Sequence, residues 1–497
     1  MFTSLVDALL LFTVTTPGLG LLAHKLNWKR LVEAHATLGF IVALIFLTDI
    51  YREVSANGVL VIVSDFPPNS PIGVCLEVDA LSVFMAAVYV LIGFIVTVYS
   101  IQDLDGDTGV PGYFALLLGI TAGMIGVVVA GDLFTLFLFW EIMCLCSYAL
   151  VAFRKEHWAP VEAGFKYLIM SGVGSLTTLF AMTLLYGMTG TLNMALLSKA
   201  LSGLVGGPWI YLALTLFIVG FGLQAGMVPF HTWLPDAHSA APAPVSAILS
   251  GAMVMTGIYG LIRILFLLFT PFLGAWRMIM SVFAVLTMFT GNLMALLQDD
   301  VKRLLAFSTI ANVGYILLGL ATSSLLGLTG SLFQILNHAI VKVLLFLCTG
   351  AFYRQAKTRS LQELAGIKRR MPVTSTLFIL GIIALAGIPP LNIFWSEWTI
   401  LIAGVEEGML TFSIVMIANL VLSVAYCLRV IQTILLKEET SLSKKASEAP
   451  ALILLPIFVL GALCIAIGVY PGPFRVVAEE AAQAALNIQA YVQAVLD

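Results

Sequence analysis

Apolar segments of about twenty residues recur along almost the whole of this chain, and they leave it few ways to fold. A helix of roughly 20 apolar residues spans the hydrocarbon core of a bilayer. Of the 497 residues, 60% are hydrophobic and 10% are charged, whereas about 25% are charged in an ordinary soluble domain. The sequence therefore predicts an all-α, polytopic protein of the cell membrane. No basic segment precedes the first apolar run, so we interpret that run as a membrane span and not as a cleaved signal peptide.

The apolar segments predict about fourteen transmembrane helices, followed by a short helix at 474–496. The expected spans are 4–23, 31–50, 78–100, 111–130, 133–153, 161–187, 209–228, 243–269, 276–297, 304–322, 326–353, 373–402, 409–436 and 450–470.

The loops between these spans carry 16 basic residues on one side and 4 on the other. The larger set is Lys25, Lys29, Arg30, Arg154, Lys155, Lys302, Arg303, Arg354, Lys357, Arg359, Lys368, Arg369, Arg370, Lys437, Lys444 and Lys445, and the smaller set is Arg52, Lys199, Arg277 and Arg475. Cytoplasmic loops of membrane proteins are enriched in Lys and Arg, which places the larger set in the cytoplasm and both termini outside.

Proline interrupts two of the expected spans. The stretch GLQAGMVPFHTWLPDAH at 222–238 contains Pro229, and ALAGIPPLNIFWSEW at 384–398 contains Pro389 and Pro390. Backbone groups freed by such a break survive in a bilayer only where protein or a water-filled cavity receives them. Two breaks in corresponding halves of a chain indicate an ion or substrate site near the midplane of a transporter-like fold.

The two breaks also predict an internal repeat. Pro229 and Pro389 are 160 residues apart, and each lies in the fourth of five successive spans. An odd number of spans gives the two copies opposite orientations, as in inverted-repeat transporters. The expected division is N-terminal helices at 1–110, a first inverted repeat at 111–270, a second at 276–436, and a last span with the C-terminal helix at 437–497.

Four ionisable residues stand out because they lie in the middle of an apolar span or directly after the second break, where a charge costs roughly 2.5–3.5 kcal/mol. They are Glu141, His338, Lys342 and Glu397, and His338 and Lys342 are four residues apart on one helix face. Acid, amine and imidazole groups with water between them can form a proton relay. Each also has a structural alternative. Glu141 could be bonded to a neighbouring helix, Lys342 a buried counter-charge, His338 a satisfied core residue, and Glu397 a cap of the half-helix after the break.

Other polar residues leave two interpretations open. His231, Asp236 and His238 flank the first break and could line a cytoplasmic proton entry or cap the short helix there. Glu162 and Lys166 have the i,i+4 spacing of a stabilising pair, and a relay role is equally compatible.

The remaining charged residues have structural interpretations. We expect Arg263 and Arg429 to snorkel to the membrane boundary, and Asp299, Asp300, Lys302 and Arg303 to form a solvated turn. The six cysteines are interpreted as buried small residues. The sequence contains no nucleotide-binding loop, nucleophile motif, metal-ligand cluster or catalytic residue, so we expect no cofactor or redox centre in this chain.

Several stretches resemble the antiporter-like subunits of respiratory complex I (chains L, M and N), of Mrp sodium/proton antiporters (the D type), and of energy-converting membrane-bound hydrogenase, formate hydrogenlyase and sulfane reductase complexes. The similar stretches are FWEIMCLCSYALVA, EAGFKYLIMSGVGS, PFHTWLPDAHSAAPAPVSAILSG, QDDVKRLLAFSTIANVGYILLG, NHAIVKVLLFL and IPPLNIFWSEW. PFHTWLPDAH is highly specific, and AHSAAPAPVSAILSG favours the hydrogenase and sulfane reductase branch. The long lateral helix of the L type is absent from the sequence.

The resemblance implies ion-translocation roles for five residues. Glu141 matches a glutamate that pairs with a lysine of the first broken helix, and Lys166 matches the KY of the preceding span. Lys342 and His338 match the connecting groups of the family's eleventh helix. Glu397 matches an acid or lysine that faces the exit path.

Two family lysines are missing from the first half. Gln224 occupies the position of the lysine five residues before the Pro of PFH, and Met255 occupies that of the lysine before the TGIYG-like turn. Gln224 can hydrogen-bond Glu141 and hold water but cannot carry a proton charge, and Met255 cannot relay a proton.

These observations leave three functions open. The first is an ion-translocating membrane subunit of an oxidoreductase complex that moves protons or sodium, with iron–sulfur clusters and nickel–iron in partner subunits. The second is a degenerate, mainly structural antiporter-like subunit. The third is an Mrp-type cation/proton antiporter subunit without redox partners. Glu141, Lys342 and Glu397 favour the first, and Gln224 and Met255 favour the second. We expect membrane and peripheral protein partners and no nucleic acid.

Overall fold

A computed structural model describes residues 2–26, 28, 30–63, 74–204 and 206–496. Lys29, counted above among the basic residues, lies outside these ranges. The described chain is almost entirely helical, with one short antiparallel hairpin of β1 (Leu60–Val63) and β2 (Cys75–Val78). The prediction of an all-α membrane protein is confirmed; the hairpin was not expected from the sequence.

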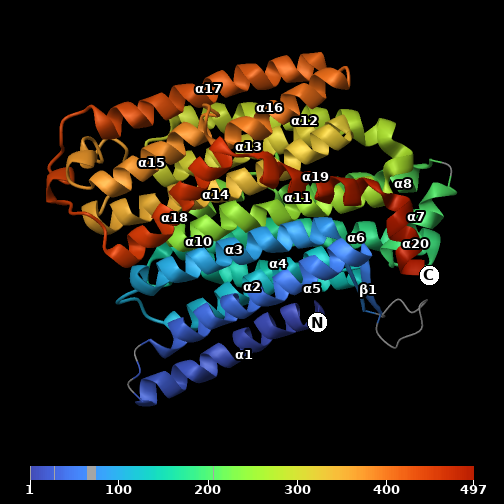
Figure 1. Ribbon diagram of the computed structural model, residues 1–497, viewed down its shortest axis with the longest axis horizontal. Coiled ribbons are helices and arrows are strands. Elements are labelled where there is room, and N and C mark those ends of the chain that lie inside the picture. The colour runs from blue at the N-terminus through green and yellow to red at the C-terminus, as the bar shows by residue number, and fades with distance from the viewer. Residues whose placement is uncertain (1, 27, 29, 64–73, 205, 497) are drawn as a thin grey trace.

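The helices form one elongated bundle (Figure 1). Those of the first half are α1 (Phe2–Leu26), α2 (Leu31–Asn57), α3 (Ala80–Asp103), α4 (Val110–Val129), α5 (Leu133–Val151), α6 (Trp158–Thr189), α7 (Met194–Ser202), α8 (Pro208–Gln224), α9 (Trp233–Ala240), α10 (Ala243–Ile248), the π-helix η1 (Leu249–Met253), α11 (Val254–Ile262) and the π-helix η2 (Arg263–Leu268).

The second half follows the short 3-10 turn η3 (Thr270–Phe272). Its elements are α12 (Leu273–Leu297), α13 (Val301–Thr322), α14 (Leu325–Ala356), η4 (Ile367–Arg369), α15 (Pro372–Leu385), α16 (Asn392–Glu406), α17 (Leu410–Leu435), η5 (Ser443–Lys445), α18 (Ala451–Val469), α19 (Gly472–Leu486) and α20 (Ile488–Leu496).

Within the described ranges, twelve helices are long and apolar enough to cross a membrane, and α8 and α15 are shorter apolar helices. The count of fourteen spans stays a prediction. The segment from α10 to η2, together with α13 and α14, is almost wholly buried, whereas α1, α2 and α17 are largely exposed. Figure 1 shows α13 and α14 in the middle of the bundle, with α1 and α17 at its edges.

At one end of the bundle α20 lies beside α7, and β1 and the start of α1 lie toward the same end (Figure 1). We call this end the terminal face. The opposite end, where α13 begins and α14 ends, carries those members of the larger basic set that the structure describes, and we call it the basic face.

The two proline breaks are built alike. In each, a helix ends and is followed by a glycine of positive φ, which is 70° at Gly226 and 65° at Gly387. Such a conformation is costly for any residue with a Cβ. The backbone hydrogen bonds and the positive-φ glycine of the first break recur in the second break 161 residues later. Pro229 therefore corresponds to Pro390, and not to Pro389 as the sequence suggested.

The broken segments run through the bundle in opposite directions. The segment α8–α9 ends near the basic face, where Asp236 pairs with Arg303 at 2.9 Å. The segment α15–α16 ends at the terminal face, where Glu407 contacts Arg277 at 3.5 Å. Each break therefore lies part-way across the bundle, between two half-length helices.

Candidate functional site

The second break holds a carboxylate in the bundle interior. Glu397 follows the start of α16 and is 3% exposed. A Cβ on Gly387 would collide with Glu397 Oε2, so the glycine leaves room for this carboxylate as well as allowing the turn. Glu397 Oε1 has no hydrogen-bond partner among the described groups, and no side chain caps α16. Glu397 therefore does not cap the half-helix; it is a buried acid aimed at the break.

Lys342 and His338 lie one turn apart in the continuous helix α14, and both are fully buried. Lys342 Nζ donates to Leu305 O at 3.2 Å and to Ser308 Oγ, both on α13. Neither ring nitrogen of His338 has a partner within the described part of the chain. A buried polar group without a partner is costly, so the His338 ring is not a satisfied core residue in this structure.

Neutral polar side chains connect Lys342 to the second break. Ser308, which binds Lys342, also accepts through its backbone carbonyl from Asn312 Nδ2 at 2.9 Å. Asn312 Oδ1 accepts from Gln334 Nε2 at 2.7 Å, and Gln334 Oε1 accepts from Ser396 Oγ. Ser396 is the residue before Glu397. A hydrogen-bonded line thus runs from the buried amine to the neighbour of the buried acid, and we call it the polar line.

Two asparagines join the polar line to the first turn of α16. Asn337 Nδ2 donates to Ser396 Oγ and to Asn392 O, both at 3.1 Å. Asn392 Nδ2 in turn donates to Asn337 Oδ1 at 3.2 Å. These bonds tie the first turn of α16 to the middle of α14.

The sequence analysis missed these neutral residues because it selected titratable groups only. Gln334, His338 and Lys342 recur every four residues on α14, so they form one polar stripe along a helix in an otherwise apolar segment. That spacing was the signal that could have found Gln334. No comparable pattern marks Asn312 or Ser396.

The first half contains a neutral counterpart of this site. Gln224 is 1% exposed; its Oε1 accepts from Ser171 Oγ at 2.9 Å, and its Nε2 donates to Tyr167 OH at 3.1 Å and to Met253 Sδ at 3.0 Å. The amide is therefore saturated by α6 and η1. The expected bond to Glu141 is not formed, and Glu141 Oε1 has no partner in the described ranges.

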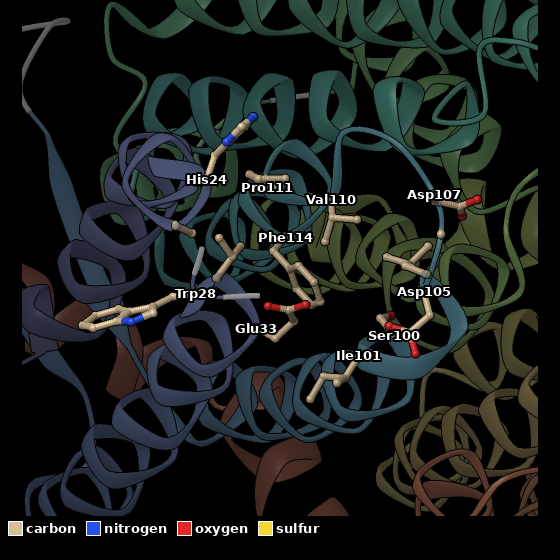
Figure 2. Close-up of a pocket in the computed structure, with 15 residues that line it drawn as sticks. His24, Trp28, Glu33, Ser100, Ile101, Asp105, Asp107, Val110, Pro111 and Phe114 are labelled. Atoms are coloured by element: carbon tan, nitrogen blue, oxygen red, sulfur yellow. The ribbon is translucent and has the colours of Figure 1, made fainter. Parts of the chain in front are cut away.

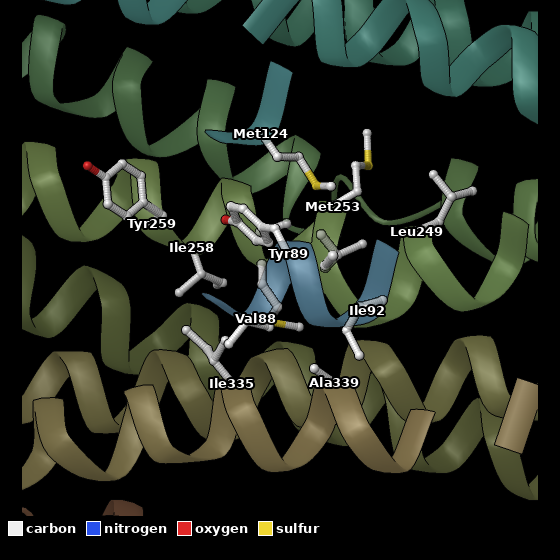
Figure 3. Close-up of a cluster of buried hydrophobic side chains, with 14 of the residues drawn as sticks. Val88, Tyr89, Ile92, Met124, Leu249, Met253, Ile258, Tyr259, Ile335 and Ala339 are labelled. Atoms are coloured by element: carbon white, nitrogen blue, oxygen red, sulfur yellow. The ribbon is translucent and has the colours of Figure 1, made fainter. Parts of the chain in front are cut away.

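Met255 lies in the apolar interior of the bundle. It is fully buried in α11, which packs with α8 and α4, and the preceding π-helix η1 packs with α14 and α3. Figure 3 shows this packing, with Tyr89 and Met253 above Ile335 and Ala339 of α14. A lysine at position 255 would have to be accommodated among these apolar groups.

The first break and the basic face are linked by ion pairs. Lys166 pairs with Glu162 at 2.8 Å and with Asp236 at 3.6 Å, and its side chain is 53% exposed. Asp236 also binds Arg303. Lys166 therefore lies at the protein surface, apart from the buried line at the second break.

The two histidines beside the first break do not cap α9. His238 is fully buried, its ring stacks on Phe346 with centroids 5.2 Å apart, and neither ring nitrogen is bonded to a described residue. His231 Nδ1 is also without a described partner. Thr232, at the N-cap of α9, makes no capping bond. The two imidazoles therefore play no capping role at this helix.

Two expectations about basic residues were wrong. Lys302, assigned to a solvated turn, is 4% exposed and donates to Ala241 O at 2.5 Å, which ties the start of α13 to the end of α9. Arg263, expected to snorkel, is 5% exposed and pairs with Asp79 at 2.6 Å. In both cases a tertiary partner from a distant segment stabilises the buried charge.

A water-accessible cavity of about 380 Å³ opens at the basic face between the ends of α1, α2, α3 and α4. Figure 2 shows Glu33 and Asp105 on its walls, with His24 and Trp28 at one side. None of the residues that line it belongs to the polar line or to either break, so we do not include this cavity in the candidate site.

Known proteins are similar to this chain over most of its length. Residues 130–423 match the family described as NADH:quinone oxidoreductase/Mrp antiporter, TM. The chain is 34% identical to NADH-quinone oxidoreductase subunit N of Desulforudis audaxviator, over 82% of this chain and 84% of that protein. It is 30% identical to F(420)H(2) dehydrogenase subunit N of Methanosarcina mazei, over 90% of this chain and 92% of that protein.

A similar solved structure is a chain of the membrane-bound sulfane sulfur reductase, an archaeal respiratory membrane complex. It is 29% identical, with a TM-score of 0.90 and coverage of 99% of both chains. The resemblance inferred from PFHTWLPDAH and the other stretches is confirmed. Together, the family match and the close relatives show that this chain belongs to the NADH:quinone oxidoreductase/Mrp antiporter transmembrane family.

Proposed function

We propose that this protein is an antiporter-like subunit of a multi-subunit membrane-bound oxidoreductase complex, in which it moves protons or sodium ions in response to electron transfer. The observation that carries the proposal is the polar line from Lys342 to Ser396, beside Glu397, in the bundle interior. A buried amine and a buried acid are costly in a membrane, and such residues usually mark ion pathways.

In this proposal Lys342 is the proton-carrying group of the second half. Both of its acceptors, Leu305 O and Ser308 Oγ, are neutral, so its proton is not trapped in an ion pair with a carboxylate. His338, one turn away, has two unpartnered ring nitrogens with which it could exchange protons through water. Glu397 would receive the proton at the second break and pass it toward the terminal face.

The first half takes a different role. Glu141 keeps a carboxylate, but Gln224 is bonded to neutral groups and Met255 lies among apolar ones. We infer that no charge moves through the first half by a lysine switch. The breaks themselves, and their opposite directions, support two inverted repeats at 111–270 and 276–436.

The redox chemistry is assigned to partner subunits. The relatives are named as subunits of NADH-quinone oxidoreductase and F(420)H(2) dehydrogenase, and the sulfane sulfur reductase is a respiratory membrane complex. We infer that iron–sulfur clusters, and nickel–iron where the partner is a hydrogenase, belong to those other subunits. The excess of Lys and Arg in the loops supports a cytoplasmic basic face and termini on the outer side of the cell membrane.

We expect Glu397→Gln to reduce ion movement per electron by about tenfold or more while the complex still assembles. Glutamine has nearly the same shape but cannot take up a proton. Proton and sodium movement would be measured separately in vesicles that contain the intact complex. The matched control is Glu406→Gln, an exposed carboxylate at the end of the same helix. Unchanged ion movement in the Glu397 variant would contradict the proposed path.

A mainly structural role is the second candidate, and the neutral surroundings of Gln224 favour it for the first half. We expect Gln224→Lys to leave the number of ions moved per electron unchanged, because the added amine would meet only the neutral groups of Ser171, Tyr167 and Met253. The ratio would be measured as for Glu397. If Gln224→Lys moved more ions per electron than the native protein, a lysine at position 224 would be sufficient to open an ion path through the first half.

The third candidate is an Mrp-type antiporter subunit without redox partners. Purification of the native complex distinguishes it from the other two candidates. Iron–sulfur or hydrogenase-like subunits that co-purify with this chain would support the oxidoreductase assignment. A complex made only of Mrp-type membrane subunits would replace it.

A further inference from the structure

A second group of buried ionisable side chains lies at the terminal face, outside the polar line. Glu77 and Asp79 come from β2 and the residue after it, Asp132 precedes α5, and Arg263 begins η2. None of the four is more than 5% exposed. The group thus contains three carboxylates and only one guanidinium. Each carboxylate has different hydrogen-bond partners.

Arg263 neutralises Asp79. Its Nη2 donates to Asp79 Oδ1 at 2.6 Å and to Ser82 Oγ at 3.0 Å, while its Nε donates to Tyr259 OH at 2.8 Å. Asp79 Oδ1 also accepts from Ser82 N as the N-cap of α3. Asp79 Oδ2 is buried and has no partner among the described groups.

Asp132 is stabilised by backbone amides. Its Oδ1 accepts from Thr135 N at 2.7 Å and its Oδ2 from Cys75 N at 3.0 Å. An N-cap carboxylate of this kind also interacts favourably with the helix dipole of α5. Its negative charge therefore has local compensation.

Glu77 has only neutral partners. Its Oε1 accepts from Cys75 Sγ at 3.1 Å, and its Oε2 accepts from Tyr491 OH. A Cβ on Gly131 would collide with its carboxyl group, so the pocket around Glu77 is tightly filled. An ionised carboxylate buried without a counter-charge is strongly disfavoured, and the usual response is to bind a proton.

The C-terminal helix α20 covers this group. The sequence predicts one helix at 474–496, but the structure has two, α19 and α20, which meet at Asn487. From α20, Tyr491 binds Glu77, and its ring centroid lies 5.4 Å from the Arg263 guanidinium carbon. A crevice of about 170 Å³ opens beside Asn487, and both Asp79 and Tyr491 line it. Water therefore reaches the edge of the buried group at the junction of α19 and α20.

We propose that Glu77 is a proton-binding site of the terminal face, with α20 as its lid: the docked helix buries Glu77 and therefore favours the protonated carboxyl, and loss of the proton to water in the crevice releases the helix. Protonation converts the Glu77 carboxylate to the neutral acid and forms one O–H bond, with no redox change. The site is independent of the transport path proposed at Lys342 and Glu397.

The remaining charged and titratable groups around Glu77 come from each neighbouring element. They are Cys75 and Asp79 of the β2 segment, Asp132 before α5, Tyr259 and Arg263 of the α11–η2 segment, and Tyr491 of α20. Lys199 lies on α7, which packs against α20, but its side chain is exposed. Arg263 is already engaged by Asp79.

Burial raises the pKa of the Glu77 carboxyl from 4.5 to about 7, against the opposing hydrogen bonds of Tyr491 and Cys75 and the charge of Arg263. With α20 released, the carboxyl would return toward the lower value. The docked helix then binds a proton that the released helix does not, so docking is strongest below pH 4.5. It weakens as pH rises toward 7, by roughly a hundredfold in the docking equilibrium.

Hydrogen exchange of α20 in the intact complex tests this site. After correction for intrinsic rates, we expect exchange in 488–496 to rise between pH 5 and 8 in the native protein. In Glu77→Gln, a neutral mimic of the bound proton, the same amides should stay protected at every pH. Tyr491→Phe removes the hydroxyl and should raise exchange mainly at low pH. Glu480→Gln, an exposed residue of α19, should behave as the native protein.

An unaltered pH dependence in Glu77→Gln would overturn the proposal. If that variant fails to assemble, infrared spectra of the native complex with isotope-labelled glutamate decide. The site is supported by a protonated-carboxyl band of glutamate that disappears near pH 7 in the native complex and is absent or shifted in Glu77→Asp. The site is rejected if the native complex shows no glutamate band that titrates near pH 7. Neither readout measures ion movement. The Glu77 site can therefore be rejected while the proposed transport function stands, and the transport function can be rejected while the Glu77 site stands.

Discussion

Replacement of Lys342 by methionine is expected to lower ion movement per electron by about a hundredfold, within the range typical for loss of a proton-transfer group. Methionine fills nearly the same space, so α14 should keep its packing against α13. The amine that donates to Leu305 O and Ser308 Oγ would be gone, and the polar line would end at Ser308. Ion movement and electron transfer would be measured in vesicles that contain the intact complex.

The control for this variant is Lys445→Met, which removes an exposed ammonium from the basic face. It should leave both rates unchanged. Normal ion movement in Lys342→Met, with normal assembly, would mean that Lys342 is only a structural group and that this chain does not carry ions through its second half.

The second large effect is expected for Gly387→Ala. Its positive φ costs an alanine about 1–2 kcal/mol, and its Cβ would also collide with Glu397 Oε2. The carboxylate must move or the break must open, so we expect a loss of thermal stability of several degrees and a loss of ion movement together. Thermal unfolding of the purified complex and ion movement in vesicles would be measured on the same preparation.

Gly408→Ala is a matched control because Gly408 has a φ of 71° and no atom would lie within 4 Å of the added methyl group. This variant carries the backbone cost without the collision. A similar loss of ion movement in both variants would show that backbone strain, and not the position of Glu397, is responsible.

Much of the fold could be predicted from the sequence because hydropathy and proline act locally. The apolar runs locate the long helices, and the breaks fall where Pro229 and Pro390 interrupt them. The β1–β2 hairpin was missed, since its four-residue strands give little periodic signal. The division of the C-terminal helix at Asn487 was missed as well, because neither proline nor glycine marks it.

The candidate site could be predicted only in part. An ionisable residue in an apolar run is conspicuous, so Lys342, His338 and Glu397 were found. Asn312 and Ser396 are neutral and common in membrane helices, and their importance comes from bonds to Gln334 across three different helices. Spacing within one helix reports which face a residue occupies but not which distant helix meets that face.

The sequence by itself determined that this chain is a membrane bundle with two broken helices and with Lys342, His338 and Glu397 inside its second half. The resemblance to the family added that Gln224 and Met255 stand where two lysines are expected. Tertiary structure alone decided how those residues are paired. In the folded chain, Gln224 is hydrogen-bonded to Ser171 and Tyr167. Arg263 is buried and paired with Asp79, and Glu77 has only neutral partners beneath α20. The physical reason is that the cost of a buried polar group depends on its partner, and the partner is supplied by segments far away in the chain.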